Sequence, residues 1–147
     1  MGYNQALSAY RETRVRTASQ GTLIVMLYDE AIKQIGAAIA LVDENVKKEP
    51  SRIEKCNGHI IKSQEIITEL MASLNMEAGG EISKNLLSLY SYFNEQLLEA
   101  NVEKTPDKMI IVRDLMEQLR AVWNQIITTN AAPSEVTSAP AGINIAG

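Results

Sequence analysis

The sequence predicts an all-α protein, an antiparallel four-helix bundle with an N-terminal capping segment and a disordered C-terminal tail. Apolar residues recur at alternating steps of three and four along most of the chain, which is the spacing of one face of an α-helix. Breaks containing Pro, Gly or charged residues divide this pattern into four stretches of similar length. Helices of similar length joined by short loops pack as antiparallel bundles.

The first helix is expected over about residues 19–45. A hydroxyl at Thr17 or Ser19 is placed to accept one of the unpaired N–H groups at its start. The charged run that ends in Pro50 terminates the helix, because proline disfavours helical backbone in the residue before it. Its apolar stripe steps by four and three: Ile24, Tyr28, Ala31, Ile35, Ala38 and Val42.

The second helix is expected over about residues 51–76. The sequence from Ser51 to Glu54 matches a capping box, in which the two side chains satisfy N–H groups of the first turn. Gly79 and Gly80 are expected to end this helix, because glycine tolerates the left-handed conformation found at helix C-termini. Its stripe is Ile53, Cys56, Ile60, Ser63, Ile67, Leu70 and Leu74.

The third and fourth helices are expected over about residues 81–102 and 106–129. Thr105 and Pro106 provide an N-cap and a first-turn proline for the fourth helix. The third helix directs Ile82, Leu86, Leu89, Phe93, Leu97 and Ala100 inward. The fourth carries Val112, Leu115, Leu119, Val122 and Ile126.

Two terminal segments flank the bundle. Residues 1–18 carry a short apolar face made of Tyr3, Leu7 and Tyr10. This segment either docks over the binding surface as a plug that a partner displaces, or packs as a frayed tail against its own helix. Residues 130–147 are rich in Ala, Pro, Gly and Ser, and we expect disorder because they cannot bury enough apolar surface to offset the ordering entropy.

The composition excludes several classes of protein. A chain of 147 residues with 46% hydrophobic and 22% charged residues is typical of one globular domain. The net charge of −4 argues against nucleic acid as a partner, since phosphate binding requires a basic patch. The chain has no apolar run long enough for membrane insertion and no apolar core of a secretory signal near its start. We therefore expect a cytoplasmic protein.

The sequence offers one arrangement of residues that could be catalytic, Cys56 and His59 on one helix. An activated thiolate is one interpretation of this spacing. The other is structural, because Cys56 occupies a core position of its stripe, where cysteine acts as a small hydrophobe. The structural interpretation is favoured. With one Cys, one His and no phosphate-binding motif, we expect no metal, no cofactor and no enzymatic activity.

Apolar residues in excess of a single core are the feature that points to function. On a helical wheel Ile61 lies about 140° and Ile66 about 80° from the centre of their core stripe, and Leu87 and Leu98 lie about 120–140° from Phe93. Second stripes on neighbouring helices can line a groove for an amphipathic partner helix, although isolated exposed apolar residues are also normal. The candidate binding residues are Ile61, Ile66, Leu87, Tyr90 and Leu98.

Four motifs, in this order and at this spacing, resemble the family of flagellar secretion chaperones called FliS. They cover about residues 3–129. The family often has Pro where this chain has Gln20 and Gly where it has Glu30. The motifs are Tyr10 with Thr17-Ala18-Ser19, the run from Leu23 to Asp29, the run from Leu74 through Tyr90 to Asn101, and the run from Leu115 to Trp123.

The resemblance implies a cytoplasmic export chaperone that binds the disordered C-terminal region of flagellin. It implies prevention of premature polymerisation, delivery to the flagellar type III export gate, and an N-terminal segment that covers part of the binding surface in the free protein. The alternative is a self-associating helical adaptor or structural bundle, in which the second stripes form the seam of a homodimer.

Overall fold

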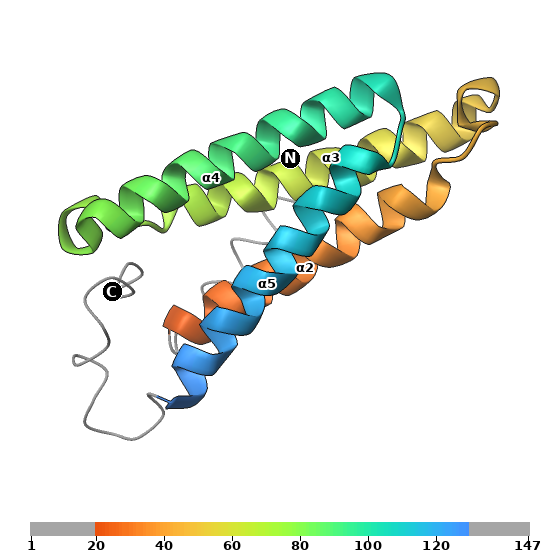
Figure 1. Ribbon diagram of the computed structural model, residues 1–147. Coiled ribbons are helices and arrows are strands. Elements are labelled where there is room, and N and C mark those ends of the chain that lie inside the picture. The colour runs from red at the N-terminus through yellow and green to blue at the C-terminus, as the bar shows by residue number, and fades with distance from the viewer. Residues whose placement is uncertain (1–19, 130–147) are drawn as a thin grey trace.

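The computed structural model describes residues 20–129. The predicted plug residues Tyr3, Leu7 and Tyr10, the predicted cap at Thr17 or Ser19 and the tail at 130–147 lie outside the described residues. Consecutive helices run in opposite directions (Figure 1). The described elements are α2 (Gln20–Leu41), the 3-10 helix η1 (Val46–Lys48), α3 (Pro50–Ala72), α4 (Met76–Glu103) and α5 (Asp107–Thr129).

The four helices form a closed ring in which each packs mainly on two others. α2 contacts α3 and α5, and α4 contacts the same two helices from the opposite side. The predicted antiparallel four-helix bundle is therefore confirmed. In Figure 1 the α3/α4 pair crosses the α2/α5 pair at a visible angle. The two pairs consequently diverge away from the end that holds the α2–α3 and α4–α5 connections.

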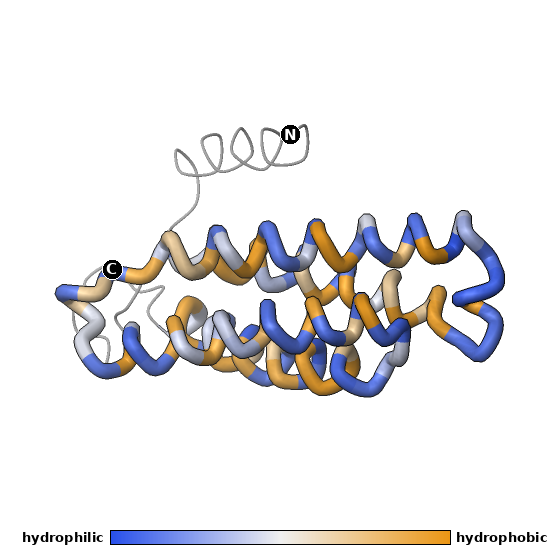
Figure 2. Tube along the Cα trace, turned by 90° about the horizontal axis from the view of Figure 1, so that it is seen from above, coloured by the Kyte–Doolittle hydropathy of each residue, from blue (hydrophilic) through white to orange (hydrophobic). Residues whose placement is uncertain are grey.

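The core is built from the predicted stripes. From Ile24 to Ala38 the stripe of α2 is buried throughout, and Phe93 and Leu97 of α4 are fully buried against it. Figure 2 shows apolar and polar residues alternating along each helix at helical spacing. The predicted burial of one stripe residue is wrong. Val122 of α5 is exposed, because it faces α4 where the two helices diverge.

The junction between α3 and α4 differs from the prediction. α3 ends at Ala72, well before the glycine pair, and α4 begins at Met76 rather than near residue 81. The side chain of Asn75 caps α4 by accepting a hydrogen bond from the N–H of Ala78 at 2.9 Å. Gly80 then interrupts the helix with φ 53° and ψ −127°. The glycine pair thus makes a kink inside α4, and asparagine supplies the helix start.

The start of α3 also differs from the prediction. The helix begins at Pro50, and Glu49 occupies the cap position without a side-chain hydrogen bond, so the predicted capping box is wrong. Proline fits the first turn because its φ is already helical and its missing N–H is not needed there. Arg52 closes the α2–α3 connection by pairing with Asp43 at 3.0 Å and donating to the carbonyl of Leu41.

Candidate partner-binding surface

Ile61 of α3 and Leu98 of α4 lie on neighbouring parts of one outer face of the bundle. Their exposed fractions are 48% and 56%. Between the two helices, the Gln64 amide donates to the Asn94 carbonyl at 3.1 Å. Ile61 lies about one turn before Gln64 and Leu98 one turn after Asn94, so in an antiparallel pair both fall on the same stretch of the seam. Both side chains are outside the core, as the wheel predicts, and their role in binding stays a prediction.

Lys104 fastens the end of this face. It ends α4 in the left-handed conformation, with φ 57°, and is buried. Its ammonium donates to Asn57 Oδ1 of α3, and to the carbonyl and Oδ1 of Asn101, each at 2.6 Å. These acceptors offset the cost of burying an ammonium group, and they hold the end of α4 against α3. Val102, which is 75% exposed, is thereby fixed one turn beyond Leu98.

Leu87 continues the face in the other direction. It is half-buried and lies three helical turns before Leu98, so both belong to one side of α4. We call this surface the outer α3–α4 face, defined by Ile61, Leu87, Leu98 and Val102. Sequence reasoning missed Val102, although its spacing of four residues from Leu98 was the signal that could have found it.

Two buried acceptors near this face have no hydrogen-bond partner within residues 20–129. They are Asn94 Oδ1 and Glu65 Oε1. Asn94 lies in the α3–α4 seam, and Glu65 follows Ile61 by one turn. An unpaired buried acceptor leaves its desolvation uncompensated. A hydrogen-bond donor brought by a partner would therefore be favoured beside these apolar residues.

Two predicted surface residues, Ile66 and Tyr90, are in the core, and the expectation that they lie on a second exposed stripe is wrong. Ile66 is fully buried because it lies on the side of α3 that faces α2. It follows His59 on that side by two turns, and His59 Nδ1 lies 2.7 Å from Gln34 Oε1 of α2. Tyr90 is buried because its hydroxyl lies 2.6 Å from that of Tyr28. Each helix packs on two neighbours, so its buried arc is wider than a single stripe.

Cys56 and His59 do not form a thiolate pair. The Cys56 thiol donates to the Ala38 carbonyl at a long distance, 3.9 Å, and burial raises its pKa. His59 instead contacts Gln34, and burial followed by the charge of Lys62 lowers the pKa of the imidazole. A reactive cysteine requires the opposite shift in the thiol pKa. This arrangement therefore fits the structural interpretation.

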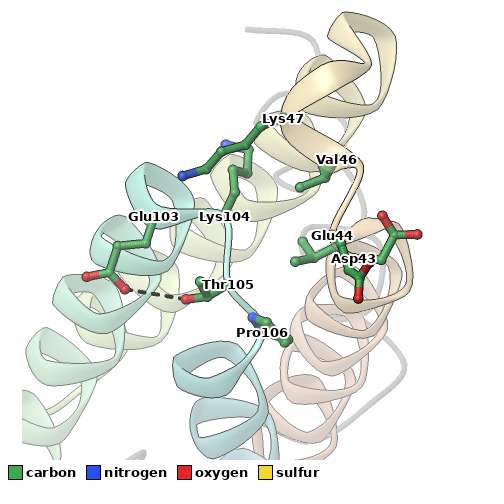
Figure 3. A pocket seen from close by; sticks show the side chains of 9 residues that line it. Asp43, Glu44, Val46, Lys47, Glu103, Lys104, Thr105 and Pro106 are labelled. Atoms are coloured by element: carbon green, nitrogen blue, oxygen red, sulfur yellow. Dashed lines mark hydrogen bonds between the residues drawn. The ribbon is translucent and has the colours of Figure 1, made fainter.

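A pocket of about 370 Å³ lies at the connection end of the bundle (Figure 3). Two of its five charged side chains form ion pairs, Asp43 with Arg52 and Glu103 with Lys108. The Thr105 hydroxyl donates to Glu103 at 3.4 Å, and α5 begins at Asp107. The lining residues are Val42, Asp43, Glu44, Val46, Lys47, Glu103, Lys104, Thr105 and Pro106.

The described residues add no sign of metal chemistry or of a membrane span. Within residues 20–129 no group of three or more His, Cys, Asp or Glu side chains is placed to hold a metal ion. No helix in the same range has the length and apolar character needed to cross a bilayer. The outer α3–α4 face is thus the feature of the described chain that most needs a functional explanation.

Comparison of the sequence with known protein families indicates what this surface could serve. The family model described as "Flagellar protein FliS" matches residues 3–130, nearly the whole chain. This chain belongs to the FliS family. The resemblance noted in the sequence motifs is thereby confirmed, and so is the assignment to the chaperones of flagellar export.

Curated relatives carry the name flagellar secretion chaperone FliS. The Bacillus subtilis protein is 29% identical over 127 residues, which cover 86% of this chain and 90% of the relative. The Salmonella typhimurium protein is 34% identical over 116 residues, covering 78% and 82%. The Vibrio cholerae protein is 29% identical over 126 residues, covering 82% and 88%. The FliS-family match therefore extends across the whole helical bundle.

Proposed function

We propose that this protein binds the C-terminal region of flagellin in the cytoplasm, prevents its premature polymerisation, and supports its delivery to the flagellar type III secretion apparatus. In this proposal it acts by binding alone, with no enzymatic activity and no cofactor. Membership of the FliS chaperone family supports a secreted flagellar client. The observation that carries the proposal is the outer α3–α4 face.

The outer face has the character expected for an amphipathic helical client. Ile61 and Leu98 belong to two adjacent helices and are each about half exposed, and Val102 is more exposed still. Apolar side chains grouped in this way on a small protein mark an interaction site. Two parallel rows of such residues accept the apolar side of a helix laid between or across them.

Coupled folding and binding explains how such a complex stays reversible. A client that is disordered when free pays an ordering cost of several kcal/mol, about 2–5, as it binds. Part of the gross interaction energy is therefore consumed, and a large wrapped surface gives moderate affinity. Release to a component of the export gate then requires competition for the client, with no need for nucleotide hydrolysis.

The N-terminal segment has a regulatory place in this proposal. Residues 1–18 precede α2 directly and carry the short apolar face of Tyr3, Leu7 and Tyr10. In the free protein this segment covers part of the client-binding surface, and the client displaces it. Such a plug shields apolar side chains from unspecific contacts and lowers the apparent affinity by the fraction of molecules that are covered.

Isothermal titration with a peptide from the C-terminal region of the cognate flagellin tests the proposal. We expect one-to-one binding with a large negative heat-capacity change, which reports apolar burial. The double variant Ile61→Asp/Leu98→Asp should bind about tenfold more weakly or worse, because it places two charges in the apolar contact. Ile111→Asp, an exposed residue of α5 away from this face, is the matched control.

Three results would contradict the proposal. The first is a lack of binding to both the peptide and full-length flagellin. The second is a double variant that binds as tightly as the parent, and the third is an Ile111→Asp variant that binds as weakly as the double variant. Retained helix content by circular dichroism ensures that a loss reflects the surface and not the fold. A stable homodimer in sedimentation velocity that survives addition of flagellin would instead favour the self-associating structural role.

A further inference from the structure

A second apolar surface lies on another side of α4, where α4 faces α5. The ion pair between Glu99 and Lys108, at 2.7 Å, marks the sides of the two helices that face each other. Tyr92 lies two turns before Glu99, so it is on the side of α4 that faces α5. On α5, the apolar residues that follow Lys108 by whole numbers of turns lie on the side that faces α4. We call this surface the α4–α5 strip. It consists of Leu89, Tyr92, Ile111, Leu115, Val122 and Ile126.

The strip is more open than a seam between packed helices. Tyr92, Ile111 and Val122 are 40%, 49% and 47% exposed, while Leu89 and Leu115 are half-buried against the core. Figure 1 shows the cause, because α4 and α5 diverge from their connecting turn. The strip is separate from the outer α3–α4 face, since Tyr92 and Leu98 point about 120° apart around α4.

We propose that residues 130–147 of this same chain fold back over the α4–α5 strip and cover it. Four of the six strip residues belong to α5, and Ile126 lies in its last turn, three residues before its end at Thr129. The chain therefore continues from the edge of the strip. Eighteen residues reach roughly 60 Å when extended, against a length of roughly 35 Å for α5.

The composition of this segment suits the strip. Glu135 is its single charged side chain, and Val136, Ile143 and Ile145 are its branched aliphatic ones. Pro133 and Pro140 disfavour a continuous helix. In an extended chain the residues at 143 and 145 project to the same side, so they can lie together on an apolar strip. The family match ends at residue 130, so this contact would be a feature of this chain beyond the matched domain.

Tethering makes a weak contact effective. A segment joined directly to its binding surface has an effective concentration in the millimolar range. A contact that would be negligible between separate molecules is then occupied a large part of the time. The N-terminal segment is a less suitable occupant, because it is already proposed to cover the outer α3–α4 face, whereas residues 130–147 continue directly from α5, which supplies most of the strip.

Paramagnetic relaxation in the full chain, without flagellin, tests this proposal. A nitroxide is attached through Ala146→Cys, because buried Cys56 will not react under native conditions. If the segment is docked about half of the time, as a millimolar contact allows, the amide signals of Ile111 and Val122 should lose at least about half of their intensity. The signal of Ile61, on the other face, should not change.

The same labelled chain carrying Ile143→Asp and Ile145→Asp should lose this selective broadening, and its unchanged spectrum elsewhere will show an intact fold. Three results would overturn the proposal: no broadening at the strip, broadening centred on Leu98, or broadening that appears when spin-labelled chains are mixed with unlabelled isotope-enriched ones. The last result identifies a second copy as the occupant. None of these outcomes depends on whether flagellin is the client.

Discussion

The hydroxyl groups of Tyr28 and Tyr90 lie 2.6 Å apart in the centre of the bundle. Their rings meet edge to face, with centroids 6.4 Å apart. Since α2 and α4 both pack mainly on α3 and α5, this pair bridges the bundle across its diagonal. It therefore fixes the depth at which the two helices meet.

Removing one hydroxyl of this pair should destabilise the fold. Tyr90→Phe leaves the buried hydroxyl of Tyr28 without its partner, and we expect a loss of about 1–3 kcal/mol in the free energy of unfolding. Tyr92→Phe, on an exposed side chain, should stay within about 0.5 kcal/mol of the parent. Urea unfolding measures both values. In the double variant Tyr28→Phe/Tyr90→Phe the losses should fall short of additive, and strict additivity would show that the hydroxyls are not coupled.

The same two tyrosines should make the protein sensitive to alkaline pH. Burial raises the pKa of Tyr90 from 10.0 to about 12, and burial with the neighbouring tyrosine raises that of Tyr28 further. Above about pH 10 the unfolded chain loses these protons while the folded chain keeps them, so stability is constant below that pH and falls above it. The slope approaches about 1.4 kcal/mol per pH unit for each tyrosine.

Urea unfolding between about pH 9 and 11 measures this slope. The variant Tyr28→Phe/Tyr90→Phe should show a shallower decline. Some decline will remain, because burial also raises the pKa of the Cys56 thiol, and Lys108 loses its ion pairs as it deprotonates. An unchanged slope in the variant would mean that the two tyrosines ionise in the folded protein as they do in the unfolded chain.

Gly80 should be required for the kink at the start of α4. Its φ of 53° with ψ of −127° is strained for any residue with a Cβ. No heavy atom lies within 4 Å of the position that a methyl group would take here, so the cost of Gly80→Ala comes from the backbone alone, about 1–3 kcal/mol. Gly58→Ala is the control, since that helical site is also open and should gain about 0.4–1 kcal/mol. Equal responses to denaturant would contradict this account.

The fold could be predicted because each helix carries a long stripe at constant spacing. The stripe of α2 is buried from Ile24 to Ala38, and a stripe of that length admits one secondary structure. Helix ends depend on one or two residues, and at the α3–α4 junction two signals compete. Asn75 and the glycine pair are both good terminators, and only the contacts of the folded chain select Asn75 as the start of α4.

The binding surface could be predicted only in part. Ile61 and Leu98 are identifiable from the sequence because they point far from their core stripes, where no neighbouring helix reaches. Ile66 and Tyr90 lie nearer to the edge of the stripe, where burial depends on which helix packs alongside. The partner of Tyr90 is Tyr28, 62 residues away in sequence, and no local pattern signals such a contact. Val122 shows the reverse error: it belongs to the core stripe of α5, and the divergence of α4 and α5 leaves it exposed.

Deleting residues 1–16 should increase the affinity for flagellin if the N-terminal segment is a plug. A segment that covers the binding surface in about nine of ten molecules lowers the apparent affinity about tenfold, so its removal should restore about that factor. Isothermal titration with the flagellin peptide measures the change, and circular dichroism verifies the helix content. The same deletion in the Ile61→Asp/Leu98→Asp background should give little gain, because the surface that the segment covers is already impaired. Weaker binding after the deletion would make the segment part of the client interface, since a displaced plug can only oppose binding.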